Sequence, residues 1–313
     1  MRNWLRYLAI TFSGKDFKTM RFETKYDSSS VNCLNLSANG VKQLSPLKDV
    51  CTIKIRNLTY NEITALIKHK LYDVKIECGY YNGNRFTIFE GGVLYVSNDM
   101  DSDRTNTAII LCANKLVAKY GQSRLNLTLR SGINMYAAVS YLCRRAGISQ
   151  TNISDVFKGM QLHDDMSNNA TIADWLQSFT DMNQQFVAST DASNATVTVS
   201  SLLRPTGRII QLRNEDINFS GGYPTLSSDG LDLSLLPFRE IRCGDYVQIP
   251  AALINMPVTT SSEISQALAY RLDPQDQYLV YKNTFSLQNR GSNFSMHLLC
   301  KSRSFILNLI GVR

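Results

Sequence analysis

The chain has 313 residues, of which 44% are apolar and 19% are charged, and its formal net charge is +7. This length allows two or three domains and enough apolar residues for buried cores, so the composition excludes an intrinsically disordered chain. The lysines and arginines form no run interleaved with aromatic residues, which argues against a nucleic-acid-binding module.

The N-terminus and the cysteines indicate where the protein folds. Arg6 interrupts the only apolar stretch near the N-terminus, so no signal peptide is expected. Apolar runs such as residues 108–113 are too short to span a bilayer, which predicts no membrane anchor. The seven cysteines include no Cys-x-x-Cys pair. We therefore expect reduced cysteines and folding in a cytoplasm.

The first third of the chain predicts a small β-barrel or sandwich. Residues 51–56 alternate apolar and polar side chains, the period of a half-buried strand. Thr59 and Glu62 form a capping box, which predicts a short helix that ends near His69. The Asn/Ser-rich connection over 32–48 leaves the strands before it undefined. Further strands are expected over 72–80, 86–96 and 105–113, with an acidic loop over 98–103.

The middle of the chain changes from the period of strands to the period of helices. Apolar residues share one helix face over 135–146, and Gly147 follows where a glycine favours a helix end. A second helix is expected over 172–182. Residues 185–189 and 196–202 are typical of a hairpin. Together these elements predict a compact α+β module.

The last third returns to strands, which are expected over 208–212, 241–249, 278–287 and 292–300. Residues 257–276 are rich in Thr and Ser and then become helix-like. They predict a long connection that crosses one end of a second barrel.

Few residues point to chemistry. His163-Asp164-Asp165 is the one cluster of metal-ligand types, and no second cluster accompanies it, so a solvated loop is the better interpretation. Glu215 and Asp216 are adjacent acids in a polar stretch, unlike the facing pair of a glycosidase. Motifs of nucleotide binding, of hydrolases and of metalloproteases are absent. The sequence predicts no metal, no cofactor and no catalytic residue.

Two stretches carry a resemblance to a known family. The first, residues 51–112, contains Val-Lys-Ile-Glu-Cys-Gly-Tyr and Phe-Glu-Gly-Gly-Val; the second, residues 222–249, contains Gly-Tyr-Pro-Thr-Leu, Asp-Gly-Leu, Leu-Leu-Pro and Cys-Gly-Asp-Tyr-Val. Both resemble the hub proteins of phage baseplates, which are similar to the N-terminal part of type VI secretion spikes. The resemblance implies a mainly β protein with two tail-tube-like β-barrel domains, residues 1–118 and 204–313, flanking a smaller α+β insert domain, residues 119–203.

The resemblance also implies a function. Such a chain would be a structural hub in the baseplate of a phage or phage-derived tail, not an enzyme, and would need no cofactor. It would form a homotrimer that joins the hexameric tail tube to the trimeric central spike. Its other partners would be baseplate wedge proteins and the tape measure protein, with DNA only as passing cargo. The virion would be its location, after assembly in the host cytoplasm. Two alternatives stay open: a tail-associated cell-wall hydrolase and the hub of a type VI secretion spike.

The N-terminal 25 residues are the most basic part of the chain. Six cations and two acids, Asp16 and Glu23, give this segment a charge of +4. We expect it to face an acidic neighbouring subunit. The alternatives are that it lines the channel and meets DNA or the tape measure protein, and that it is a solvated edge. The predicted interface residues are Arg2, Arg6, Lys15, Lys18, Arg21 and Lys25.

Overall fold

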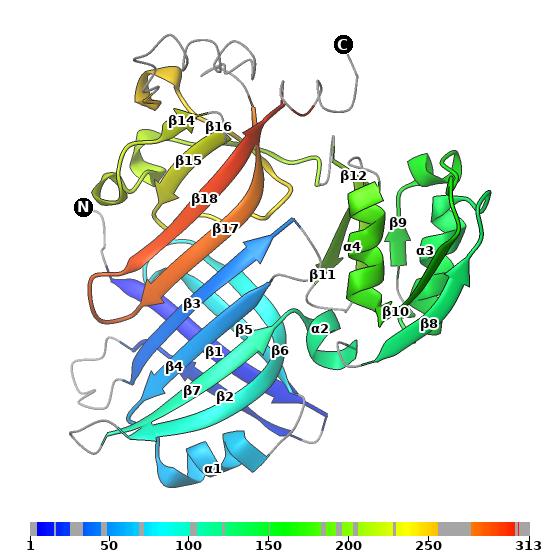
Figure 1. Cartoon of the computed structure of the whole chain (residues 1–313). Helices are drawn as coiled ribbons and strands as arrows, with labels where there is room; N and C mark the ends of the chain where they lie inside the picture. The colour runs from blue at the N-terminus through cyan, green and yellow to red at the C-terminus, as the bar shows by residue number, and fades with distance from the viewer. Residues whose placement is uncertain are drawn as a thin grey trace.

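The computed structural model describes residues 5–15, 17–25, 34–44, 49–68, 72–100, 105–120, 123–149, 151–182, 186–191, 196–202, 206–227, 230–255, 277–303 and 306. Most strands belong to one large sheet that is almost wholly antiparallel, and a smaller body of helices and short strands lies at its side (Figure 1). The prediction of a mainly β chain is confirmed.

The N-terminal part of the sheet has seven strands and one helix. Every second residue of strand 50–56 is buried, as its alternating sequence predicts. The capping box also forms, because the Thr59 N–H donates to Glu62 Oε2 (2.8 Å) and the Glu62 N–H donates to Thr59 Oγ1 (3.3 Å). The elements are β1 (Arg6–Gly14), β2 (Phe17–Glu23), β3 (Asn35–Gln43), β4 (Val50–Arg56), α1 (Tyr60–Lys68), β5 (Asp73–Tyr80), β6 (Arg85–Met100) and β7 (Asn106–Ala113).

Strand β6 changes partner half-way along its length. Its first half pairs with β5 and its second half pairs with β7, with a bulge between Val93 and Tyr95. The strand continues to Met100, so the loop predicted from residue 98 begins later than expected. Asn98 and Asp99 disfavour strands by themselves, but pairing with β7 overrides that preference.

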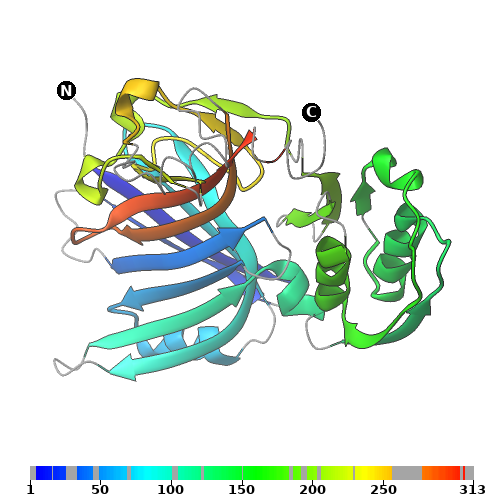
Figure 2. The same cartoon turned by 45° about the horizontal axis from the view of Figure 1, so that its top comes forward.

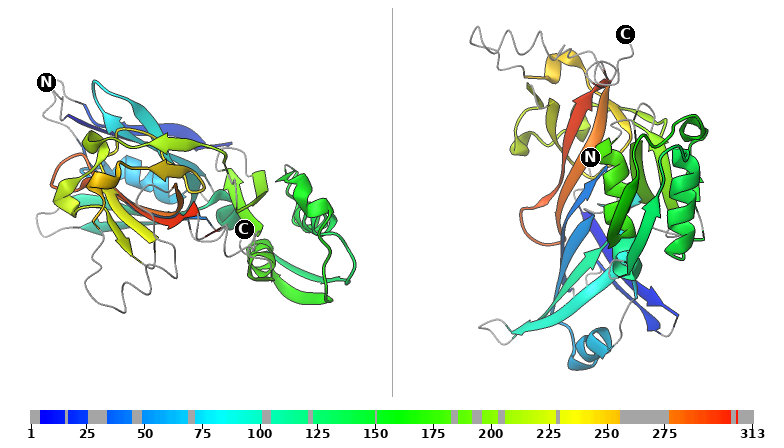
Figure 3. Two further views of the ribbon diagram at one scale, coloured as in Figure 1. Left: turned by 90° about the horizontal axis from the view of Figure 1, so that it is seen from above. Right: turned by 45° about the vertical axis from the view of Figure 1, so that its right-hand side comes forward.

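The body at the side of the sheet lies between β7 and the last third of the chain. Its core contains Trp175, Phe179 and Phe186, and no residue of the large sheet belongs to that cluster. The two predicted helices and the hairpin are confirmed, and Gly147 has the positive φ of +80° expected of a helix-ending glycine. Figure 3 shows this body standing beside the sheet. Its elements are α2 (Lys115–Tyr120), β8 (Arg124–Leu129), α3 (Met135–Arg145), β9 (Thr151–Ile153), η1 (Asp155–Lys158), β10 (Met166–Thr171), α4 (Ile172–Met182), β11 (Phe186–Asp191) and β12 (Thr196–Ser201).

The described residues of the last third contribute six strands to the large sheet. The strand predicted over 241–249 is shorter than expected, because the Arg242 N–H donates to Asp245 Oδ2 (2.8 Å) and Gly244 takes a φ of +96°, which makes a turn. The connection predicted over 257–276 lies outside the described residues. The elements are β13 (Ile209–Gln211), η2 (Asn214–Asp216), η3 (Phe219–Gly221), β14 (Thr225–Ser227), β15 (Gly230–Leu235), β16 (Tyr246–Gln248), η4 (Ala251–Leu253), β17 (Tyr278–Gln288) and β18 (Phe294–Ser302).

The large sheet joins the two ends of the chain. Its strand order is β14-β15-β18-β17-β3-β4-β7-β6-β5-β1-β2, with β13 and β16 beside β17. Strands from both ends of the chain also share one hydrophobic core. Figure 2 shows how strongly the sheet curves. No pair among the described strands joins β14 to β2, so this part of the chain shows no closed barrel. The domain limits at residues 118 and 203 stay predictions.

Candidate interaction surface

Strands β3 and β17 join the N-terminal and C-terminal parts of the sheet. They pair antiparallel over seven residue pairs, from Gln43 with Lys282 to Ser37 with Gln288. In the middle of the joint, Gly40 lies opposite Phe285. A Cβ atom on residue 40 would lie 2.4 Å from Phe285 Cζ, so the ring packs where any other residue would carry a side chain.

Asn289 extends this joint beyond the end of β17. Its side-chain Oδ1 accepts a hydrogen bond from the Leu36 N–H (2.9 Å), and its Nδ2 donates to the Leu34 carbonyl (2.8 Å). The Asn289 N–H donates to the Leu36 carbonyl (3.1 Å). One side chain thus continues the hydrogen bonding of two strands past the point where they part.

The Arg6 side chain links β1 to the turn between β17 and β18. Its guanidinium donates to the carbonyl oxygens of Gln288 (3.3 Å), Gly291 (2.6 Å) and Ser292 (3.3 Å). It also lies 5.3 Å from the centre of the Phe294 ring. The predicted interface residue Arg6 therefore binds within its own chain, where it satisfies carbonyl oxygens of the β17–β18 turn.

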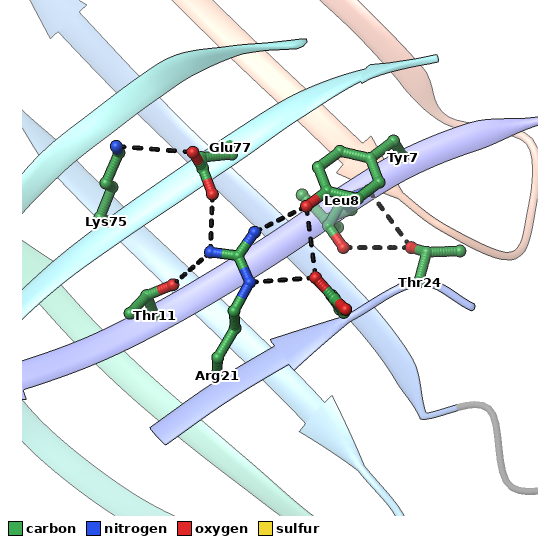
Figure 4. A network of polar contacts seen from close by, with 8 residues as sticks. Tyr7, Leu8, Thr11, Arg21, Thr24, Lys75 and Glu77 are labelled. Carbon is green, nitrogen blue, oxygen red and sulfur yellow. Dashed lines mark hydrogen bonds and ion pairs between the residues drawn. The ribbon is translucent and has the colours of Figure 1, made fainter. Parts of the chain in front are cut away.

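Arg21 is the centre of a polar network on β1, β2 and β5 (Figure 4). Its guanidinium donates to Glu23 Oε2 (3.0 Å), Glu77 Oε2 (2.8 Å) and the Tyr7 hydroxyl (2.7 Å), and also to Thr11 Oγ1 (2.9 Å). Burial by itself raises the pKa of Glu77, but the hydrogen bond and charge of Arg21 outweigh it, so this pKa lies below its ordinary value. Arg21 thus holds the edge strand β2 onto the sheet.

The six predicted interface cations do not form one patch. Arg6 begins β1 and Lys15 follows its end, so roughly 30 Å of extended strand separates them. Lys15, Lys18 and Lys25 have exposed side chains near β2, and Arg2 lies outside the described residues. Lys15 and Lys18 make no ion pair with any described residue. Whether these cations contact a partner stays a prediction.

The second half of β6 exposes apolar side chains that the sequence analysis did not single out. Leu94 is 46% exposed, Tyr95 is 63% exposed, and Leu111, in register with Tyr95 on β7, is 40% exposed. Leu94 and Tyr95 lie in an unbroken apolar run, residues 93–96, which is typical of a buried strand, so only the structure reveals their exposure. Exposed aromatic and aliphatic side chains in one place are typical of protein interfaces.

Two of the acids considered for chemistry, Asp165 and Asp216, have structural partners. Asp165 Oδ1 accepts a hydrogen bond from the Ser131 N–H (2.6 Å). The buried Asp216 pairs with Arg239 (2.9 Å) and accepts from the Arg213 N–H (2.9 Å), which fixes a turn. Within the described residues, no group of three His, Cys, Asp or Glu side chains is placed to hold a metal ion. None of the helices in that part of the chain is both long enough and apolar enough to cross a membrane.

No known protein family and no curated protein matches the sequence, but solved structures match the fold. The 43 kDa tail protein of prophage MuSo2 from Shewanella oneidensis aligns over 95% of this chain and 97% of its own, with a TM-score of 0.58 and 6% identity. A tail protein from Neisseria meningitidis aligns over 94% and 96%, with a TM-score of 0.54 and 9% identity. The chain has the fold of phage tail proteins.

The tail-protein fold also extends to secretion systems. A type VI secretion component from E. coli, itself structurally similar to the T4 tail proteins gp27 and gp5, aligns over 86% of this chain and 73% of its own. Its TM-score is 0.52 and its identity is 11%. These likenesses bear out the predicted resemblance to phage tail and type VI spike proteins.

Proposed function

We propose that the chain is a structural hub of a phage or phage-derived tail baseplate, a homotrimer that joins the hexameric tail tube to the trimeric central spike. The observation that supports this most is the match of nearly the whole chain, side body included, to nearly the whole of two phage tail proteins. A shared fold alone does not fix a function, so the proposal also needs features of this chain.

The large sheet supplies such a feature. Two β-rich parts of one chain are joined edge to edge through β3 and β17, and we propose that each is one tail-tube-like barrel unit. Three chains would then present six such units. That number matches a six-fold tube on one side, while the trimer itself matches a three-fold spike on the other.

The tube protein, the spike protein, the wedge proteins and the tape measure protein are the partners of this proposal, and passing DNA is only cargo. The virion baseplate is the proposed location, after assembly in the host cytoplasm. We propose no catalytic role, because Asp216 is engaged by Arg239 and offers no free general acid. The likeness to the E. coli component favours one second candidate, the hub of a type VI secretion spike.

The mass of the purified chain in solution tests the proposal. A homotrimer has three times the 35.2 kDa of one chain, which light scattering after size-exclusion chromatography measures. A monodisperse monomer or hexamer, both alone and in the particle, would refute the hub. Labelling with an antibody then separates the two candidates, since a phage hub lies at the end of a virion tail and a type VI hub does not.

A further inference from the structure

One backbone edge of the second half of β6 has no partner strand in the described part of the chain. Backbone groups alternate between the two edges of a strand. The Asn57 N–H donates to the Asn106 carbonyl (3.1 Å), so Asn106 faces β4 and its neighbour Thr107 faces β6. Thr107 is in register with Asp99. Asp99 therefore faces β7, and the N–H of Asn98 faces the other way.

Pairing on that other side of β6 ends early. The Val93 N–H donates to the Tyr72 carbonyl (3.0 Å), and no described strand continues the ladder beyond it. Helix α1 also lies near β6, yet the two share no hydrogen bond among the described residues. The stretch from Leu94 to Asn98 thus combines an open edge with exposed apolar side chains, a combination that favours pairing with another strand.

The sheet has a second open edge on β2. The Thr24 N–H donates to the Leu8 carbonyl (2.9 Å), so Thr24 faces β1. By the same alternation, the backbone groups of Arg21 and Glu23 face away from β1, where no described strand lies.

The opposite end of the sheet is covered by its own chain. The Leu226 N–H of β14 donates to the Asn255 carbonyl (2.9 Å), which occupies the outer edge of that strand. Near the C-terminal end of β15, the Ser234 carbonyl accepts a hydrogen bond from the Asn218 N–H (2.9 Å). Along the main path of the large sheet, among its described strands, β6 and β2 therefore carry open edges.

We propose that the open edge of β6 pairs with the open edge of β2 of a second copy of this chain. The proposal rests on the proposed function and specifies the contact that builds its trimer. A contact between two different edges is head-to-tail, so it can repeat until three copies close into a ring. A contact between two identical edges would instead end with a dimer. The charges agree, since Asp99 is exposed on β6 while Lys15 and Lys18 are exposed beside β2. The β3–β17 joint is the same kind of contact within one chain.

Proline substitutions test the backbone contact. Proline removes an N–H and is tolerated on an edge strand whose N–H points to solvent, so Asn98→Pro and Glu23→Pro should keep the fold. Each is expected to change the mass in solution from that of three chains to that of one. The matched variants Asn98→Ala and Glu23→Ala keep the N–H and should stay trimeric. Circular dichroism and the thermal midpoint verify that each variant is folded.

Charge exchange gives an independent test where a proline variant fails to fold. Lys18→Glu is expected to weaken the trimer, and adding Asp99→Lys is expected to restore it. A trimeric wild type whose folded proline variants stay trimeric would overturn the proposed contact, and so would charge variants that change nothing. A wild type that is monomeric both alone and in the particle would instead refute the hub itself, so the two failures are distinguishable.

Discussion

Replacing Asn289 by alanine tests whether one side chain secures the joint between β3 and β17. The change leaves the fully buried Leu36 N–H without its acceptor at 2.9 Å. An unsatisfied buried donor costs about 1–3 kcal/mol, and the lost bond to the Leu34 carbonyl adds about 0.5–1.5 kcal/mol. We expect the free energy of unfolding to fall by about 1.5–4.5 kcal/mol.

Urea titration followed by the circular dichroism of the β-strands measures this loss. Wild type and variant are compared at one protein concentration, because self-association shifts the apparent stability. Ser286→Ala is the matched control: it removes an exposed hydrogen bond to Asn39 in the same joint (2.8 Å) and should cost under about 1 kcal/mol. Equal, small losses in both variants would refute the reasoning that Asn289 satisfies a buried donor.

Three further predictions concern packing, charge and thiols. Gly40→Ala forces a methyl group against the Phe285 ring, and we expect a loss of about 1–3 kcal/mol in thermal unfolding; an unchanged midpoint would contradict this packing. Glu77→Gln should destabilise the protein at pH 7, where the Arg21 pair is charged. Folding lowers the pKa of Glu77 below its ordinary value of 4.5, so the stability that its carboxylate contributes is lost as the pH falls through this lowered pKa. The difference in stability between Glu77→Gln and wild type should then disappear, and a difference that persists at pH 2 would argue against the ion pair. Burial raises the pKa of the Cys143 thiol to about 12, so a thiol reagent at pH 8 should modify it only after denaturation, and rapid native modification would contradict its burial.

The alternating strands were predictable from sequence, and the opening strands were not. Strand β4 follows the period of two because one face is buried and the other is exposed. In β1, four successive residues from Tyr7 to Ile10 are buried, since polar side chains of β2 and β5 cover its outer face. Strand β3 contains Asn39 and Gly40, which disfavour strands, and only its place between β4 and β17 keeps it extended.

The predicted interface cations show what composition leaves out. Counting charges groups Arg6 and Arg21 with Lys15 and Lys18, but only coordinates reveal that both arginines bind within the chain. No sequence pattern pointed to the role of Asn289, because its hydrogen-bond partners are more than 250 residues away in the sequence. Contacts between such distant segments depend on the tertiary register, which no local pattern encodes.

Because β17 lies near the C-terminal end of the chain, the β3–β17 joint delays completion of the large sheet until late in synthesis. Asn39 and Ser286 meet across 247 residues of sequence, so β3 leaves the ribosome long before its second neighbour exists. Until then β3 can pair with β4 on one edge only, while the side body, whose core draws only on residues 116–199, is already able to fold. Closing a loop of this length slows folding and leaves the intermediate prone to aggregation. Premature termination after β7 and before β17 would therefore yield a chain that exposes the edge of β3 in the middle of its own sheet.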